Sequence, residues 1–71
     1  MNIGLYVARR ESGMTQKEVA EMLGIHHQSY CNKEKGHTDF TIKQGLQLTR
    51  IFDKTLDELF GGNDDDKRTT A

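Results

Sequence analysis

The sequence contains no proline, a single cysteine and only five aromatic residues, two tyrosines and three phenylalanines, among 71 positions. The scarcity of aromatic residues disfavours a sheet-rich fold, because strands are enriched in them. One cysteine cannot form an internal disulfide, which suits a reducing compartment. No apolar run approaches the ~18 residues that span a bilayer, and the first residues lack the pattern of a secretory signal. We therefore expect a cytoplasmic protein without a membrane partner.

An excess of charge of either sign is also lacking, since the net charge is −1. Residues 1–60 carry eight Lys or Arg and eight Asp or Glu. Many nucleic-acid binders are strongly basic, so a nucleic-acid partner depends here on where the charges lie. The final stretch, GGNDDDKRTTA, has no apolar residue larger than alanine. Its composition predicts one domain over 1–60 and a flexible acidic tail over 61–71.

Local signals for helix starts and ends recur along the chain. Gly13, Gly24 and Gly36 lie at nearly even intervals, and glycine commonly follows the last turn of a helix. Thr15 and Thr41 each stand three residues before Glu or Gln, and Thr55 repeats the pattern, which is that of the capping box. The apolar residues between these signals have helical spacing. The sequence predicts an all-α, compact five-helix bundle with helices over 2–11, 15–22, 26–34, 41–52 and 56–60.

The same spacing predicts which side chains face the core. In the first helix the predicted inward positions are Leu5, Ala8 and Ser12. In the fourth helix they are Ile42, Leu46, Leu48, Ile51 and Phe52. Gly45 lies inside that helix at a cost of ~1 kcal/mol relative to alanine. It either permits close packing or is simply tolerated.

Residues 16–35 have the features of a helix-turn-helix. Ala20 is small enough for two helices to cross above it, and Gly24 suits a turn with positive φ. The apolar contacts that fix the crossing would come from Val19, Leu23, Ile25 and Tyr30. In this motif the second helix enters the major groove of DNA.

With these residues in view, the chain resembles the Cro/repressor-type helix-turn-helix proteins of phages and bacteria, the XRE family. The stretch MTQKEVAEMLGI is similar to the first two segments of the family motif, and KTLDELF is similar to its closing segment. The resemblance covers about residues 3–60. It implies a lambda repressor-like five-helix domain that binds double-stranded operator DNA as a homodimer, with no cofactor and no enzymatic activity. The protein would then act at the nucleoid, or in the host cytoplasm if a phage encodes it.

The resemblance also implies roles for individual residues. Base edges would be read by His27, Gln28 and Asn32. Gln and Asn suit adenine, because each donates and accepts one hydrogen bond. Contacts to DNA phosphates would come from Gln16, Lys17, Ser29, Lys35, His37 and Thr38.

Further matches concern structure and assembly. Arg9 and Glu34 correspond to a structural ion pair between the first and third helices. The dimer contact is expected among Phe52, Leu56, Leu59 and Phe60.

Four positions depart from the family pattern. Lys33 stands where an apolar residue is common, Asp53 replaces a frequent glycine, and His26 replaces the Ser or Thr helix cap. Phe40 stands where proline or a polar residue is frequent, and is either a core plug or an exposed protein contact.

Three alternatives to DNA reading were open. His27 and Cys31 are one helical turn apart, but adjacent His26 points roughly 100° away, and a structural zinc ion needs four ligands. We therefore expect no metal. The sequence contains no set of nucleophile, base and acid, so we expect no enzyme. The remaining rival is a protein-binding modulator, anti-repressor or antitoxin-like, that acts on a partner repressor.

Overall fold

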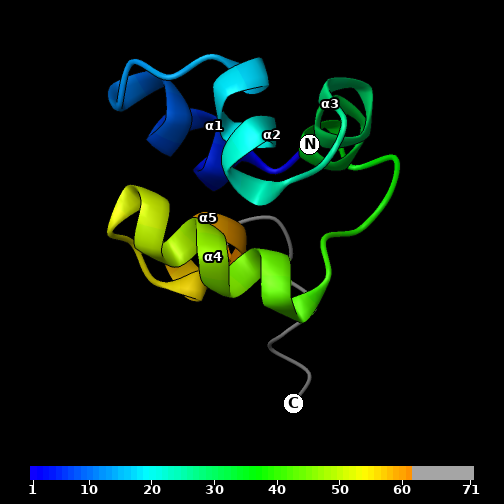
Figure 1. Ribbon diagram of the computed structural model, residues 1–71. Helices are drawn as coiled ribbons and strands as arrows, with labels where there is room; N and C mark the ends of the chain where they lie inside the picture. The colour runs from blue at the N-terminus through cyan, green and yellow to red at the C-terminus, as the bar shows by residue number, and fades with distance from the viewer. Residues whose placement is uncertain (62–71) are drawn as a thin grey trace.

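The computed structural model describes residues 1–61 and confirms the predicted all-helical fold (Figure 1). The helices are α1 (Ile3–Glu11), α2 (Gln16–Leu23), α3 (His27–Lys35), α4 (Ile42–Phe52) and α5 (Leu56–Phe60). Every boundary lies within one residue of the prediction. The predicted acidic tail lies, apart from Gly61, outside the described residues. None of the helices within 1–61 is long and apolar enough to cross a membrane.

Hydrogen bonds from side chains start four of the five helices. The Thr15 hydroxyl accepts from the Glu18 N–H at 3.1 Å, while the Thr15 N–H donates to the Glu18 carboxylate at 2.8 Å. The same reciprocal pair forms at the starts of α4 and α5. At α3, His26 Nδ1 accepts from the Gln28 N–H at 3.2 Å. Histidine therefore caps the helix where Ser or Thr was expected.

The C-cap residues of α2, α3 and α4 lie in the left-handed backbone region. Gly24 closes α2 with φ 74°, as the short turn of a helix-turn-helix requires. α4 ends at Asp53 with φ 55°, and within residues 1–61 it is the only non-glycine residue with positive φ. Asp tolerates this region better than most residues, but it lacks the freedom of glycine. Asp53, which replaces the glycine frequent in the family pattern, therefore carries a conformational cost.

The core lies between α1, α2 and α3 on one side and α4 and α5 on the other (Figure 1). Its buried apolar side chains within residues 1–61 are Leu5, Ala8, Val19, Ala20, Leu23, Tyr30, Leu48, Phe52 and Leu59. The four apolar residues predicted to fix the helix crossing are thus buried or, for Ile25, packed against the core.

Three inward positions were predicted wrongly. Ile42 is 84% exposed and Leu46 is 48% exposed. The side of α4 that faces the core instead carries Gly45, Leu48 and Phe52, which are spaced by three and four residues. Ser12 is exposed because it follows the last turn of α1, where its N–H caps the Ala8 carbonyl.

Two glycines let α5 approach its neighbours closely. A Cβ on Gly4 would clash with backbone atoms of α5, lying 2.8 Å from the Leu59 carbonyl oxygen. A Cβ on Gly45 would lie 3.3 Å from Leu56 Cδ2 and 3.8 Å from Phe60 Cε2. Gly45 is therefore a close-packing residue.

These contacts predict different outcomes for the substitution of alanine at the two glycines. Gly4→Ala forces the α5 backbone away and should lower the free energy of unfolding by ~1–3 kcal/mol, although alanine is the better helix former. At Gly45 the nearest group is the end of the half-exposed Leu56 side chain, which can move. Gly45→Ala should therefore cost less than Gly4→Ala or stabilise the protein, by up to ~1 kcal/mol. Urea unfolding followed by circular dichroism measures both, and equal effects would contradict the contrast.

A second prediction concerns the end of α4. Asp53→Gly should raise the free energy of unfolding by about 0.5–1 kcal/mol, because glycine adopts the left-handed region freely. Asp53→Asn is the control for charge, since it removes the unfavourable anion from the helix C-terminus and keeps the side-chain shape. Thermal unfolding should rank Gly first, then Asn, then Asp. If Asp53→Ala were as stable to thermal unfolding as Asp53→Gly, the conformational explanation would be wrong.

Candidate nucleic-acid interface

The Glu34 carboxylate, 1% exposed, is the centre of a buried hydrogen-bond network. Arg9 donates to it twice, through Nε to Oε2 at 2.8 Å and through Nη2 to Oε1 at 3.2 Å. The Tyr30 hydroxyl donates to Oε2 at 2.7 Å, and Gln16 Nε2 donates to Oε1 at 2.8 Å. No buried side-chain nitrogen or oxygen within residues 1–61 lacks a partner.

The network keeps Glu34 ionised. Burial alone raises the pKa of the Glu34 carboxyl, but hydrogen bonds from Arg9, Tyr30 and Gln16 outweigh it and lower the pKa below its ordinary value of 4.5. The hydrogen bond with Glu34 raises the pKa of Arg9. Burial, and then the hydrogen bond to Glu34, raises the pKa of the Tyr30 hydroxyl far above its usual range. At neutral pH the site therefore holds an ion pair and a neutral phenol.

These bonds fix α3 against the rest of the fold, because their donors come from α1, α2 and α3 itself. Cys31 Sγ also donates to Gln16 Oε1 at 3.1 Å. At the C-terminal end of α3, Asn2 Nδ2 also donates to the Lys33 carbonyl and the Asn2 N–H donates to the Glu34 carbonyl, each at 3.0 Å. The buried side of α3 is therefore held by hydrogen bonds over the stretch from Tyr30 to Glu34.

The opposite side of α3 presents polar side chains. Gln28, Asn32 and Lys35 are spaced by four and three residues and share one face of the helix. Gln28 and Lys35 are exposed, and Asn32 is half-buried. His27 is exposed one turn before Cys31, on the side of α3 that faces Gln16. The three predicted base-reading residues thus occupy adjoining sides of α3 instead of a single row.

The predicted phosphate contacts divide into two groups. Ser29, Lys35, His37, Thr38 and Lys17 are exposed, the last of these in the first turn of α2. Gln16 is half-buried, and both ends of its amide are already hydrogen-bonded inside the protein. A phosphate contact from this side chain would break one of those bonds. The structure gives Gln16 a positioning role that no sequence signal indicated.

Lys33 and Phe40 together brace the connection between α3 and α4. Lys33 Nζ donates to the Asp39 carbonyl at 2.8 Å and lies 5.8 Å from the centre of the Phe40 ring. The Phe40 ring lies between those of Tyr30 and Phe60, at centroid distances of 5.9 and 5.7 Å. Phe40 is therefore a half-buried plug against the core, and Lys33 covers it. This brace positions the loop that carries His37 and Thr38.

The predicted dimer contacts are mostly internal. Phe52 and Leu59 are buried in the core, at 6% and 1% exposure, and Phe60 is half-buried. Only Leu56, at 45%, is exposed among the four. Within residues 1–61, no three His, Cys, Asp or Glu side chains gather around one point.

The lowered pKa of Glu34 predicts a specific pH dependence. The contribution of ionised Glu34 to the free energy of unfolding is complete above the pKa that the carboxyl has in the unfolded chain. It is lost as the pH falls through the lower pKa of the folded state. Glu34→Gln should cost ~3–5 kcal/mol at neutral pH, because it leaves Arg9 buried without a counter-ion. The difference from wild type should shrink in acid, as measured by urea unfolding at several pH values.

A milder variant keeps this test usable if Glu34→Gln does not fold. Tyr30→Phe removes one hydrogen bond to the carboxylate and should cost ~1.5–3 kcal/mol at neutral pH. The hydrogen bond from the Thr55 backbone also lowers the pKa of the Glu58 carboxyl. Because this cap is present in the wild type and in every variant, its pH dependence cancels when their free energies of unfolding are subtracted. A cost that stays constant into acid would contradict the ionised network.

The chain also resembles known proteins. The HTH-type transcriptional regulator ImmR of Bacillus subtilis is 33% identical over 70 residues, which cover 96% of this chain and 55% of that protein. An uncharacterized HTH-type transcriptional regulator of Archaeoglobus fulgidus is 28% identical over 58 residues, covering 82% of this chain and 83% of that one.

A solved structure and a family model agree with these relatives. The crystal structure of a transcriptional regulator from Listeria innocua matches 84% of this chain and 56% of its own, with a TM-score of 0.78 at 25% identity. This chain therefore spans little more than half the length of the Bacillus and Listeria proteins. The Helix-turn-helix family model matches residues 5–59. The chain belongs to the XRE-type helix-turn-helix family.

Proposed function

We propose that this protein is a sequence-specific, DNA-binding transcriptional regulator that reads operator DNA with α3 in the major groove. One observation carries the proposal: α3 is locked to the body by Tyr30 and Glu34 on one side and presents Gln28 and Asn32 on the other. A rigidly held helix with an exposed polar face is what base reading requires. The family and the regulator names of the relatives support the same function.

The chemistry of the exposed face suits direct readout. Gln28 and Asn32 each offer one donor and one acceptor, which match the N6 and N7 edge of adenine. His27 donates to guanine N7 or O6. Phosphates are held by the five exposed residues Lys17, Ser29, Lys35, His37 and Thr38. The free N–H groups at the start of α2 add to this grip.

Charge sets the strength of binding. Since residues 1–60 have no net charge, non-specific affinity is modest and falls gently with salt. Two half-sites read by a homodimer multiply a weak affinity. We therefore propose a homodimeric, non-enzymatic repressor of the Cro-like kind, from a phage or a bacterium, acting in the cytoplasm.

The balanced charge also favours a second candidate, a modulator that binds a partner repressor. Such a protein has no need of a basic face. It would show no sequence preference on DNA.

Selection of bound sequences from random DNA tests the proposal. We expect one enriched motif, and Gln28→Ala should reduce discrimination at one position of it by ~1–3 kcal/mol. Lys35→Ala should weaken binding to all sequences and lower the salt slope by about 0.9.

The matched control is Lys54→Ala, which removes the same charge from the α4–α5 connection, at the opposite end of the fold from α3 (Figure 1). It should leave both the motif and the salt slope unchanged. If no motif is enriched, the DNA-reading function is wrong and the modulator gains support.

A further inference from the structure

Arg10 is an exposed cation that no acidic side chain neutralises. Within residues 1–61 the one salt bridge joins Arg9 to Glu34, and Arg10 takes no part in it. The guanidinium of Arg10 is nevertheless held in place, because its Nη1 donates to the Tyr6 hydroxyl at 2.8 Å. Its Cζ lies 5.6 Å from the centre of the Tyr6 ring, and the Cζ of Arg9 lies over the same ring at 5.5 Å. The charged end of Arg10 is therefore both free of a counter-ion and restricted in position.

Arg10 lines a hollow of ≈ 410 Å³ at the start of α2. The residues around this hollow come from the end of α1, the turn that follows and the start of α2: Arg9, Arg10, Gly13, Met14, Thr15 and Gln16. Among the residues of 1–61 that line it, none is acidic. Arg9 is already paired with Glu34, and the Gln16 amide is hydrogen-bonded inside the protein at both ends. Arg10 therefore supplies the uncompensated charge of this hollow.

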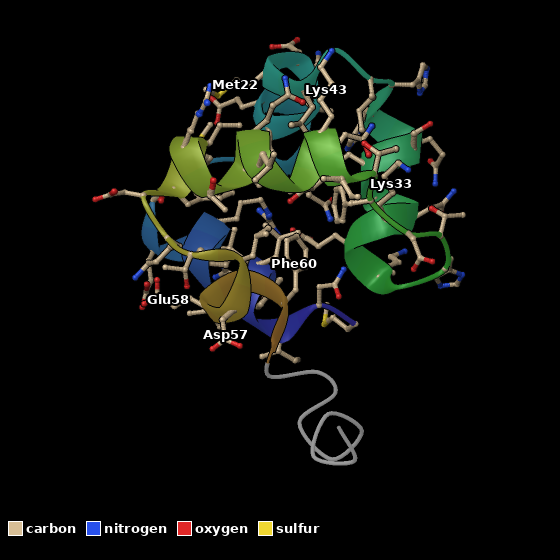
Figure 2. The ribbon with its side chains drawn as sticks, turned by 90° about the horizontal axis from the view of Figure 1, so that it is seen from below. Met22, Lys33, Lys43, Asp57, Glu58 and Phe60 are labelled. Carbon is tan, nitrogen blue, oxygen red and sulfur yellow. The ribbon has the colours of Figure 1, made fainter. Side chains whose placement is uncertain are left out.

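The acidic side chains nearest to this hollow in the sequence are engaged elsewhere. Glu11 lines a different hollow, between α1 and α5. The Glu18 carboxylate accepts a hydrogen bond from the Thr15 N–H at 2.8 Å and so belongs to the cap of α2. The two acidic side chains of α5 project on the far side of α4 from Met22 of α2 (Figure 2). Arg10 is thus the charged group of the hollow that is open to an anion.

We propose that Arg10, positioned by Tyr6, binds a phosphate of the DNA backbone at this hollow, and this inference rests on the proposed function. A guanidinium presents several N–H groups in one plane, which match two oxygens of a phosphate. Tyr6 accepts from one of these groups, and the others have no acceptor within residues 1–61. Because the start of α2 lines the same hollow, a phosphate that approaches the free N–H groups there comes within reach of Arg10.

Tyr6 is the positioning residue of this contact. Its hydroxyl accepts from Arg10 and its ring lies under the guanidinium, so the cation is in place before DNA arrives. A side chain that is already fixed loses less conformational entropy on binding. Arg10 comes from α1 and therefore adds a phosphate contact outside α2, α3 and the loop after α3. Such a contact enlarges the basic footprint of a domain whose residues 1–60 have no net charge.

Binding to the selected DNA motif over a range of salt concentrations tests the role of Arg10. Arg10→Ala should weaken binding to all sequences and lower the salt slope by about 0.9, the value for one phosphate contact. Arg10→Lys keeps the charge but loses the planar fork, so it should keep the slope and bind more weakly than the wild type. Arg50→Ala is the matched control, because it removes an exposed arginine from the last turn of α4. It should change neither the affinity nor the slope.

Tyr6→Phe separates the position of the charge from the charge itself. It removes the hydroxyl that holds Arg10 and keeps the ring, so the salt slope should stay the same while the affinity falls about two- to tenfold. In the Arg10→Ala background the same change should leave the affinity for DNA unaltered, which a merely structural role of Tyr6 would not predict. Circular dichroism and urea unfolding check that each variant keeps its fold.

Ethylation of single phosphates locates the contact on the DNA backbone. At one phosphate, ethylation should weaken binding of the wild type but not of Arg10→Ala, while the other sensitive phosphates stay the same in both. An unchanged salt slope in Arg10→Ala, or an identical ethylation pattern, would overturn the inference. Because a phosphate contact needs no particular base sequence, the slope is also measured on a duplex of random sequence. A lower slope there without an enriched motif would contradict base reading alone.

Discussion

The Glu34 carboxylate is the constraint on which the placement of α3 depends. Its two oxygens accept hydrogen bonds from Arg9 of α1, Gln16 of α2 and Tyr30 of α3. Each of these bonds has a preferred length and direction, whereas apolar packing alone tolerates small rotations of a helix. A buried ion pair adds little net stability compared with apolar residues of the same volume. What it contributes here is a defined orientation for α3, whose outer face is proposed to read DNA.

The apolar core has a different task, which is to join the two halves of the fold. A chain of this size buries little apolar surface, and α5 has only five residues. It stays attached because Gly4 and Gly45 let it approach α1 and α4 closely, and because Leu59 is buried between the helices. The aromatic contacts of Phe40 with Tyr30 and Phe60 then connect the core to the Glu34 network.

Most of the fold is predictable from the sequence because its signals are local. Each Thr capping box and each turn glycine acts within a few residues, so the helix boundaries follow without tertiary information. The polar face of α3 follows in the same way from helical spacing. Tyr30 lies one helical turn before Glu34, so the hydrogen bond between them could have been predicted from the sequence.

The remainder depends on how helices meet. Apolar spacing placed Ile42 and Leu46 in the core, but α4 turns Gly45, Leu48 and Phe52 inward. This rotation depends on the helices against which α4 packs, and no local pattern encodes it. The two partners of the Gln16 amide come from residues fifteen and eighteen positions away. The family resemblance implied that Gln16 contacts a DNA phosphate. Such a contact would compete with the two internal hydrogen bonds of its amide.

The absence of net charge on residues 1–60 connects the fold with the proposed mode of DNA binding. Arg9 and Glu34 neutralise each other in the interior, so seven basic and seven acidic residues of 1–60 are left for the surface. The amide side chains of Gln28 and Asn32, which are proposed to read bases, carry no charge. The proposed binding to DNA therefore has a weak long-range attraction and depends on short-range hydrogen bonds that form only in register. If the protein acts as the proposed dimer, the concentration of that dimer, and hence the strength of its self-association, sets how much of an operator is occupied.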